Sequence, residues 1–195
     1  MTPFLRPFTA DDDEALIRWF PDARSLRRFG GPSLLWPLDR GQLEAIRADP
    51  GLHAFTLWAG EPPAPVGHVE LRRTGPQSAR LARVGIAPAR RGEGLGRALV
   101  AAALAEAARL GCVRVELGVY ADNAVARALY ESFGFAPAGG PDAEGIVPMR
   151  RDEAAGQGLE PQLPEPESGV LPITPPRNAA GQCSRPLGSA GGRPS

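Results

Sequence analysis

A glycine-rich turn between an apolar strand and a long helix constrains this chain more than any other feature of its sequence. The strand predicted over 80–86 ends before Pro88, which has no amide hydrogen to donate to a sheet. Three glycines at alternate positions, beginning with Gly92, then open a helix that we predict over 94–110. Such a turn exposes a row of backbone N–H groups at a helix N-terminus, where the helix dipole adds partial positive charge. The turn therefore predicts a binding site for a diphosphate group.

Two other phosphate-binding motifs do not fit this turn. The P-loop requires a Gly-Lys pair, and the whole chain contains no lysine. The dinucleotide-binding fingerprint G-x-G-x-x-G requires glycine at its sixth place. Counting from Gly92, that place holds Arg97, and counting from Gly94 it holds Leu99. The spacing R-x-x-G-x-G that begins at Arg91 is the pattern that still fits phosphate binding. The structural alternative is a turn that serves only the packing of the helix.

The order of the predicted elements indicates an α/β fold of the α+β type. Two strands joined by a short Gly/Pro-containing connection precede two successive strand–helix units. Hairpin strands followed by such units give a mixed sheet with helices on both faces. Strands are predicted over 3–8, 53–59, 66–72, 80–86 and 113–119, with two short ones near Phe135 and over 146–150, and helices over 11–20, 39–48, 94–110 and 123–133.

A second motif lies on the last of these helices. The residues from Asn123 to Phe135 read N-x-x-A-x-x-L-Y-x-x-x-G-F. Asn123 and Tyr130 are seven positions apart, so they share one helix face and are separated by about 10 Å along its axis. That separation suits two contacts with an extended ligand. As alternatives, Asn123 is a helix cap and Tyr130 is a packed aromatic beside Phe133.

The two motifs, in this order and at this distance, resemble those of the GNAT family of N-acetyltransferases. The resemblance is specific over 80–135 and extends in layout over 3–151. It implies a GNAT-like acyl-CoA N-acyltransferase fold, with a mostly antiparallel central sheet of about seven strands. It also implies acetyl-CoA as co-substrate and transfer of the acetyl or acyl group to a primary amine by direct attack in a ternary complex. The acceptor would be a small-molecule amine or an amine of a protein or peptide, and the protein a monomer or homodimer.

The resemblance assigns roles to particular residues. The backbone N–H of Ile86 would donate to the thioester carbonyl, and the amides from Arg91 to Arg97 would bind the diphosphate. Tyr130 would protonate the departing thiolate. The complete set expected to contact the cofactor is Ile86, Ala87, Pro88, Arg91, Gly92, Glu93, Gly94, Leu95, Gly96, Arg97, Asn123 and Tyr130.

The base that deprotonates the acceptor is less clearly marked. The strand over 80–86 carries no carboxylate, so we rank Glu70 first, Glu116 second and a chain of water molecules third. His68 shares the strand face of Glu70 by period-two alternation. The alternative for each carboxylate is a solvated strand face or an ion pair with arginine. Trp36 is expected either to cover the acceptor pocket or to anchor the core.

Composition excludes several other classes of protein. The 22 basic and 22 acidic residues cancel, which argues against nucleic-acid or anionic-membrane partners. Without lysine, Schiff-base chemistry on the enzyme is impossible. Two cysteines (Cys112 and Cys183) and two histidines predict neither a disulfide framework nor a metal site. No signal-like N-terminus and no long apolar segment are present, so we expect a cytoplasmic protein.

The composition changes at the boundary between residues 151 and 152. From 152 to 195 there is no aromatic residue, and 15 of the 44 residues are proline or glycine. Such a segment buries too little apolar surface to offset the entropy of ordering it. We therefore expect a catalytic domain over 1–151 and a disordered tail over 152–195.

Two rival functions remain open at this point. The first is a catalytically silent sensor that binds acyl-CoA on the same fold, although Tyr130 argues against it because a passive binder needs no acid at the sulfur. The second is an interaction protein that acts through its proline-containing tail.

Overall fold

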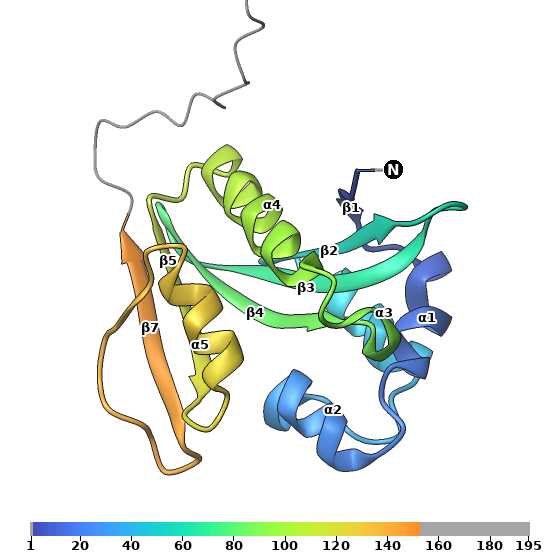
Figure 1. Cartoon of the computed structure of the whole chain (residues 1–195), viewed down its shortest axis with the longest axis horizontal. Coiled ribbons are helices and arrows are strands. Elements are labelled where there is room, and N and C mark those ends of the chain that lie inside the picture. Colours follow the sequence, from blue (N-terminus) through green and yellow to red (C-terminus); the bar gives the residue numbers. More distant parts are fainter. Residues whose placement is uncertain (1, 153–195) are drawn as a thin grey trace, which may run out of the picture. The chain divides into compact units, whose positions relative to one another are not determined.

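Successive antiparallel pairs build the first half of the sheet in chain order (Figure 1). The structure, a computed structural model, describes residues 2–152. The first four strands form three antiparallel pairs, each strand beside the next in the chain: β1 (Phe4–Pro7), β2 (Leu52–Ala59), β3 (Ala64–Gly75) and β4 (Ser78–Ile86).

The second half of the sheet begins with a parallel pair. β5 (Arg114–Tyr120) lies parallel to β4, and β7 (Ile146–Asp152) and the short β6 (Ala136–Pro137) follow it in antiparallel pairing. The strand order is β1-β2-β3-β4-β5-β7-β6. The prediction of a mixed, mostly antiparallel sheet of about seven strands with helices on both faces is confirmed.

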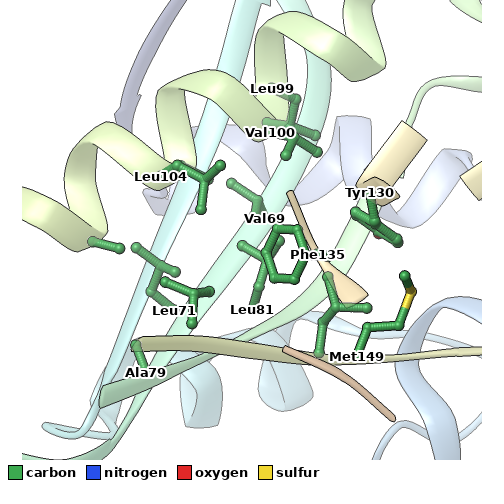
Figure 2. Close-up of a cluster of buried hydrophobic side chains, with 14 of the residues drawn as sticks. Val69, Leu71, Ala79, Leu81, Leu99, Val100, Leu104, Tyr130, Phe135 and Met149 are labelled. Atoms are coloured by element: carbon green, nitrogen blue, oxygen red, sulfur yellow. The ribbon is translucent and has the colours of Figure 1, made fainter. Parts of the chain in front are cut away.

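The larger hydrophobic core lies between the sheet and two helices on one face. α4 (Leu95–Arg109) packs on β3 and β4, and α5 (Ala124–Glu131) lies beside it. The burial pattern of β5 reflects this packing, because its buried residues alternate with exposed ones, as expected for a strand with one face against a core. Figure 2 shows side chains from strands and helices meeting in this core: Val69, Leu71, Ala79, Leu81, Leu99, Val100, Leu104, Tyr130, Phe135 and Met149.

The opposite face is covered by the N-terminal helices. The segment predicted as one helix over 11–20 is a 3₁₀ turn, η1 (Ala10–Asp12), followed by α1 (Asp13–Arg18). α3 (Arg40–Ala48) follows Asp39, whose side chain accepts the Gln42 N–H. A second core joins these helices to the sheet: Phe8, Leu16, Trp19, Leu26, Leu34, Leu38, Leu43, Ile46, Leu52 and Ala87.

One helix was not predicted. α2 (Ala23–Gly30) follows Asp22, whose side chain accepts the Ser25 N–H at 2.7 Å, and leads into the 3₁₀ turn η2 (Gly31–Ser33). The helix carries three arginines in eight residues, and Leu26 and Gly30 are its buried positions. It is amphipathic, but it is short and poor in apolar residues, so no helix was predicted here although the N-cap is a standard signal.

β7 continues to Asp152, one residue past the predicted domain boundary, and Asp152 pairs in register with Arg114. The rest of the predicted tail lies outside the described residues. Within residues 2–152, none of the helices combines the length and the apolar composition that a membrane crossing needs.

Candidate active site

The central feature of the site is an opening in the sheet between β4 and β5. Their parallel pairing covers three residue pairs, from Ser78↔Arg114 to Arg80↔Glu116. Beyond these pairs β4 stays bound to β3 and β5 stays bound to β7, so the two halves of the sheet separate. The backbone groups that line the opening can pair with an extended ligand in place of a neighbouring strand.

A bulge at Arg83 bends β4 at the start of this opening. His68 pairs with Gly85 and Glu70 pairs with Ala82, so one residue of β3 opposes two of β4. Arg83 has a φ of +46°, the one non-glycine residue among the described ones in the left-handed region. A bulge of this kind increases the local twist, which separates β4 from β5.

Ile86 presents its backbone to the opening. The Ala87 N–H donates to the Val66 carbonyl of β3 at 2.9 Å. Because successive residues of an antiparallel strand alternate in direction, the Ile86 amide and carbonyl point away from β3, toward the opening. The Arg91 Nε donates to that carbonyl at 3.3 Å, which ties the glycine-rich turn to the strand end.

The glycine-rich turn lies between the end of β4 and the start of α4, where the sequence predicted a phosphate cradle. Gly92 and Gly94 have φ values of +84° and +76°, and a Cβ at either position would point into open space. Gly94 is the N-cap of α4, a 15-residue helix, so the free amides of its first turn face the same space. The turn thus has the two properties that phosphate binding requires, exposed N–H groups and a helix dipole.

The side chains of the turn have varied surroundings. Arg90 and Glu93 form an ion pair at 2.8 Å, and Arg97 donates to Ser132 at 3.1 Å. Ala87 and Leu95 are buried in the two cores, so what they can offer a ligand is their backbone. Pro88 starts the 3₁₀ turn η3 (Pro88–Arg90), and Gly96 lies against α5, where an added Cβ would come within 3.4 Å of Leu129.

Asn123 and Tyr130 both line the opening. They belong to a slot of about 120 Å³ between β4 and β5. The Asn123 side chain accepts the Ala126 N–H at 3.2 Å, so it caps α5, as the structural alternative predicted. Tyr130 is buried and its ring meets Phe135 edge-on, with centroids 5.8 Å apart (Figure 2). Burial raises the pKa of Tyr130 to about 12, so the phenol keeps its proton at neutral pH.

Glu70 stands in a buried polar cluster beside the slot. Its carboxylate is 1% exposed and accepts hydrogen bonds from Arg83 and, at 3.3 Å, from His68 Nε2. Arg83 also donates to the Ser33 hydroxyl at 2.8 Å. Burial opposes ionisation of Glu70 most strongly, but the hydrogen bonds and charges of His68 and Arg83 together outweigh it and lower the pKa of Glu70. Glu70 is therefore a carboxylate at neutral pH.

A larger cavity of about 390 Å³ joins the slot to Glu70. The cavity and the slot share a wall that includes Arg28, Phe29, Ala82, Arg83, Gly118 and Tyr120. Glu116 is not part of this wall; it lines a neighbouring cavity of about 340 Å³ with Arg80 and Arg150. Of the two candidate bases, Glu70 lines the cavity that shares Arg83 and Tyr120 with the slot, and Glu116 lines the neighbouring one.

Several residues of the wall were not predicted. Arg28 and Phe29 come from α2, whose helix the sequence pattern did not reveal, and Arg83 belongs to a bulge that depends on pairing with β3. Trp36 is 51% exposed, so the expectation that it anchors the core was wrong, and it lines neither the slot nor the 390 Å³ cavity. Among the described residues, no group of three or more His, Cys, Asp or Glu side chains is placed to hold a metal ion.

The sequence profile of the Acetyltransferase (GNAT) family matches residues 14–135. The chain belongs to this family. The matched residues include both motifs on which the resemblance was based.

Two relatives are mycothiol acetyltransferases. That of Beutenbergia cavernae is 37% identical over 106 residues, which are 54% of this chain and 29% of the relative. That of Kocuria rhizophila is 54% identical over 52 residues, which are 27% of this chain and 17% of the relative. The chain thus matches less than a third of the length of either protein.

Solved structures share the fold at low identity. The spermidine N-acetyltransferase of Vibrio cholerae, in complex with CoA and spermine, is 21% identical with a TM-score of 0.64, over 77% of this chain and 95% of that one. The ribosomal-protein-S18-alanine N-acetyltransferase of Escherichia coli is 22% identical with a TM-score of 0.58, over 81% and 99%. These likenesses establish the fold.

Proposed function

We propose that this protein transfers an acetyl group from acetyl-CoA to the primary amine of an acceptor by direct attack in a ternary complex. The observation that carries the proposal is the opening between β4 and β5, which has the glycine cradle at one end and the acceptor-sized cavity beside it. An extended pantetheine fits between two separated strands because their facing backbone groups lack strand partners there. The amine then enters from the cavity that Glu70 lines.

The cofactor would be held mainly by backbone groups. The diphosphate binds the amides between Arg91 and Arg97, with the α4 dipole adding to the attraction. The Ile86 N–H donates to the thioester carbonyl and stabilises the negative charge that develops on its oxygen during attack. Asn123 contributes indirectly, because its side chain caps the helix that carries Tyr130.

Tyr130 would hydrogen-bond the departing sulfur. A thiol has a pKa of about 8.5, whereas the pKa of Tyr130 is raised to about 12, so complete proton transfer to a free thiolate is uphill by about 3.5 pH units. The phenol is therefore best suited to stabilise the charge on sulfur by donation. As the C–N bond forms and the C–S bond breaks, the sulfur leaves as a thiolate that accepts the Tyr130 hydrogen bond and then takes a proton from water.

Glu70 would accept a proton from the attacking nitrogen, directly or through a water molecule. It is ionised and lines the cavity, and His68 Nε2 lies 3.3 Å from its carboxylate. Its lowered pKa makes it a weak base. The acceptor ammonium first loses one proton to water, because only the neutral amine has a lone pair with which to attack. As the C–N bond forms, the nitrogen becomes far more acidic than the free ammonium, so a weak base suffices to accept the second proton. Glu116 stays the second candidate.

Acetyl-CoA consumption against a panel of amines, followed by release of free thiol, tests the proposal, with calorimetric titration of CoA beside it. We expect binding of CoA and thiol release with at least one class of primary amine. Binding without turnover on any amine would support the silent sensor. Absence of CoA binding would refute the proposed function. Membership of the acetyltransferase family favours the enzyme over the sensor.

A further inference from the structure

The cavity beside the slot is rich in guanidinium groups. Among the described residues, Glu70 is the one acidic side chain in its wall. Four arginines line the cavity: Arg28, Arg72, Arg80 and Arg83. The arginines come from three different elements, α2, β3 and β4, so the clustering is produced by the fold and is not a local run of charge. A site of this composition is suited to an anion.

Three of the four arginines are already neutralised. Arg83 is paired with Glu70, Arg28 with Asp122 at 2.9 Å, and Arg72 with Asp49 at 2.9 Å. The fourth, Arg80, has no ion-pair partner in the described part of the chain. It supplies the uncompensated positive charge of the cavity.

The backbone of β5 gives Arg80 a defined position. A Cβ added at Gly118 would lie 3.1 Å from Arg80 Nη2, so the guanidinium extends across β5 over the one residue of that strand with no side chain. Gly118 is part of the slot and of both larger cavities, and Arg80 lines the two larger cavities. Glu116 is the register partner of Arg80 on β4 and of Arg150 on β7.

We propose that the acceptor amine carries an anionic oxygen group, a carboxylate or a phosphate, which Arg80 binds in the 390 Å³ cavity beside the slot. The proposal rests on the proposed function, since it places the acceptor in this cavity. Guanidinium groups bind carboxylate and phosphate with paired N–H donors, and they repel a second cation. The acceptor is therefore an amine with an anionic substituent, and polyamines such as spermidine are poor acceptors for this chain.

Matched amine pairs test the charge requirement. The full chain is assayed with acetyl-CoA and L-alanine against L-alaninamide, β-alanine against β-alaninamide, and O-phosphoethanolamine against ethanolamine, with spermidine as the polycation. We expect kcat/KM to be at least about tenfold higher for the anionic member of at least one pair, as one charge-assisted hydrogen bond provides. The carboxylate and phosphate arms identify which anion is preferred. Equal rates within every pair, or preference for spermidine, would overturn the inference.

An Arg80→Gln variant tests the residue. We expect KM for the anionic amine to rise roughly 10–100-fold, with kcat and the KM for acetyl-CoA changed little and the KM for the neutral partner unchanged. Arg18→Gln is the matched control, since it removes the same charge from an α1 side chain that lies outside the cavity. If Arg80→Gln retains the preference for the anionic partner, Arg80 is not the binding residue.

Calorimetric binding of the same amines to the complex with CoA provides a readout without turnover. Anionic amines that bind while no amine is acetylated would refute the proposed catalysis and keep the anion site. Neutral amines that are acetylated as well as anionic ones would refute the anion site and keep the proposed catalysis. If neither member of any pair binds, the anion site is refuted directly.

Discussion

Replacing Tyr130 with phenylalanine isolates one hydroxyl in the proposed reaction. The ring keeps its place beside Phe135, because the substitution changes no carbon of the packed side chain. The pKa of Tyr130 is raised to about 12 by burial, so the group lost is a neutral donor throughout the usual assay range. The predicted loss is therefore that of a hydrogen bond to the charged sulfur of the transition state.

The size of the effect follows from that role. A hydrogen bond to a charged acceptor contributes about 1.5–3 kcal/mol, which corresponds to roughly a 10- to 150-fold lower kcat. Binding of acetyl-CoA involves a neutral sulfur, so its Kd should change by no more than about fivefold. Tyr120→Phe is the matched control, as the chain has two tyrosines and the Tyr120 ring instead lies under Arg28 at 5.0 Å. We expect a change of a few-fold at most there.

The pH dependence carries a second test of the same reasoning. Since the phenol stays protonated until the pH approaches about 12, the ratio of the two kcat values should be constant between pH 6 and pH 10. Stopped-flow or steady-state thiol release at several pH values measures it. Equal rates for both forms would leave Tyr130 as a core aromatic. An alkaline limb below pH 10 that is present in the native enzyme and absent in Tyr130→Phe would show that the phenol ionises far more readily than its burial allows.

Three further predictions address the cofactor site, the base and the core. Gly94→Glu should abolish the rise in Tm that acetyl-CoA produces. Gly94→Ala, which shares the unfavourable φ of +76°, should keep most of that rise. An unchanged rise in both variants would show that the diphosphate does not bind at this turn. Glu70→Gln should lower kcat with little change in CoA binding. The stability that ionised Glu70 contributes is fully present above its unfolded pKa of about 4.5, and it should be lost as the pH falls toward the lower pKa of the folded state. An acid unfolding series of both forms measures this loss. Leu99→Ala should lower the free energy of unfolding by about 2–5 kcal/mol, because Leu99 is 0% exposed, while Val125→Ala, at a site 84% exposed, should cost under about 0.5 kcal/mol; denaturant titration decides between them.

The part of the site that could be predicted from sequence is the part encoded locally. The cradle depends on Gly92 and Gly94 and on the helix that follows them, and all of these are consecutive in the chain. Asn123 and Tyr130 share one helix face for the same reason. Local spacing therefore predicted the glycine turn before α4 and the shared helix face of Asn123 and Tyr130, which line the slot; the binding roles of these residues stay predictions.

The rest depends on pairing between distant segments. Nothing in the sequence of 80–86 or 113–120 shows that their pairing ends after Arg80 and Glu116, because each strand alone has an ordinary apolar pattern. The same holds for Arg83, whose bulge is defined by its register with β3. The pKa of Tyr130 could not be predicted either, since it follows from burial by several elements and not from its neighbours in the chain. A ranking of Glu70 over Glu116 was possible, but its physical basis, the cavity wall, was not visible.

Arg83 links the geometry of the cofactor slot to the chemistry of the acceptor cavity. Its left-handed backbone, unfavourable for a residue with a Cβ, accompanies the bulge from which β4 leaves β5. Its side chain holds Glu70 ionised and binds Ser33 at the end of α2 and η2. A glycine there would adopt the same φ at lower cost, but it would leave the buried carboxylate with His68 alone. The strained arginine is thus consistent with one residue meeting two requirements: the bulge opens the sheet for the thioester, and the guanidinium keeps a charged carboxylate beside it.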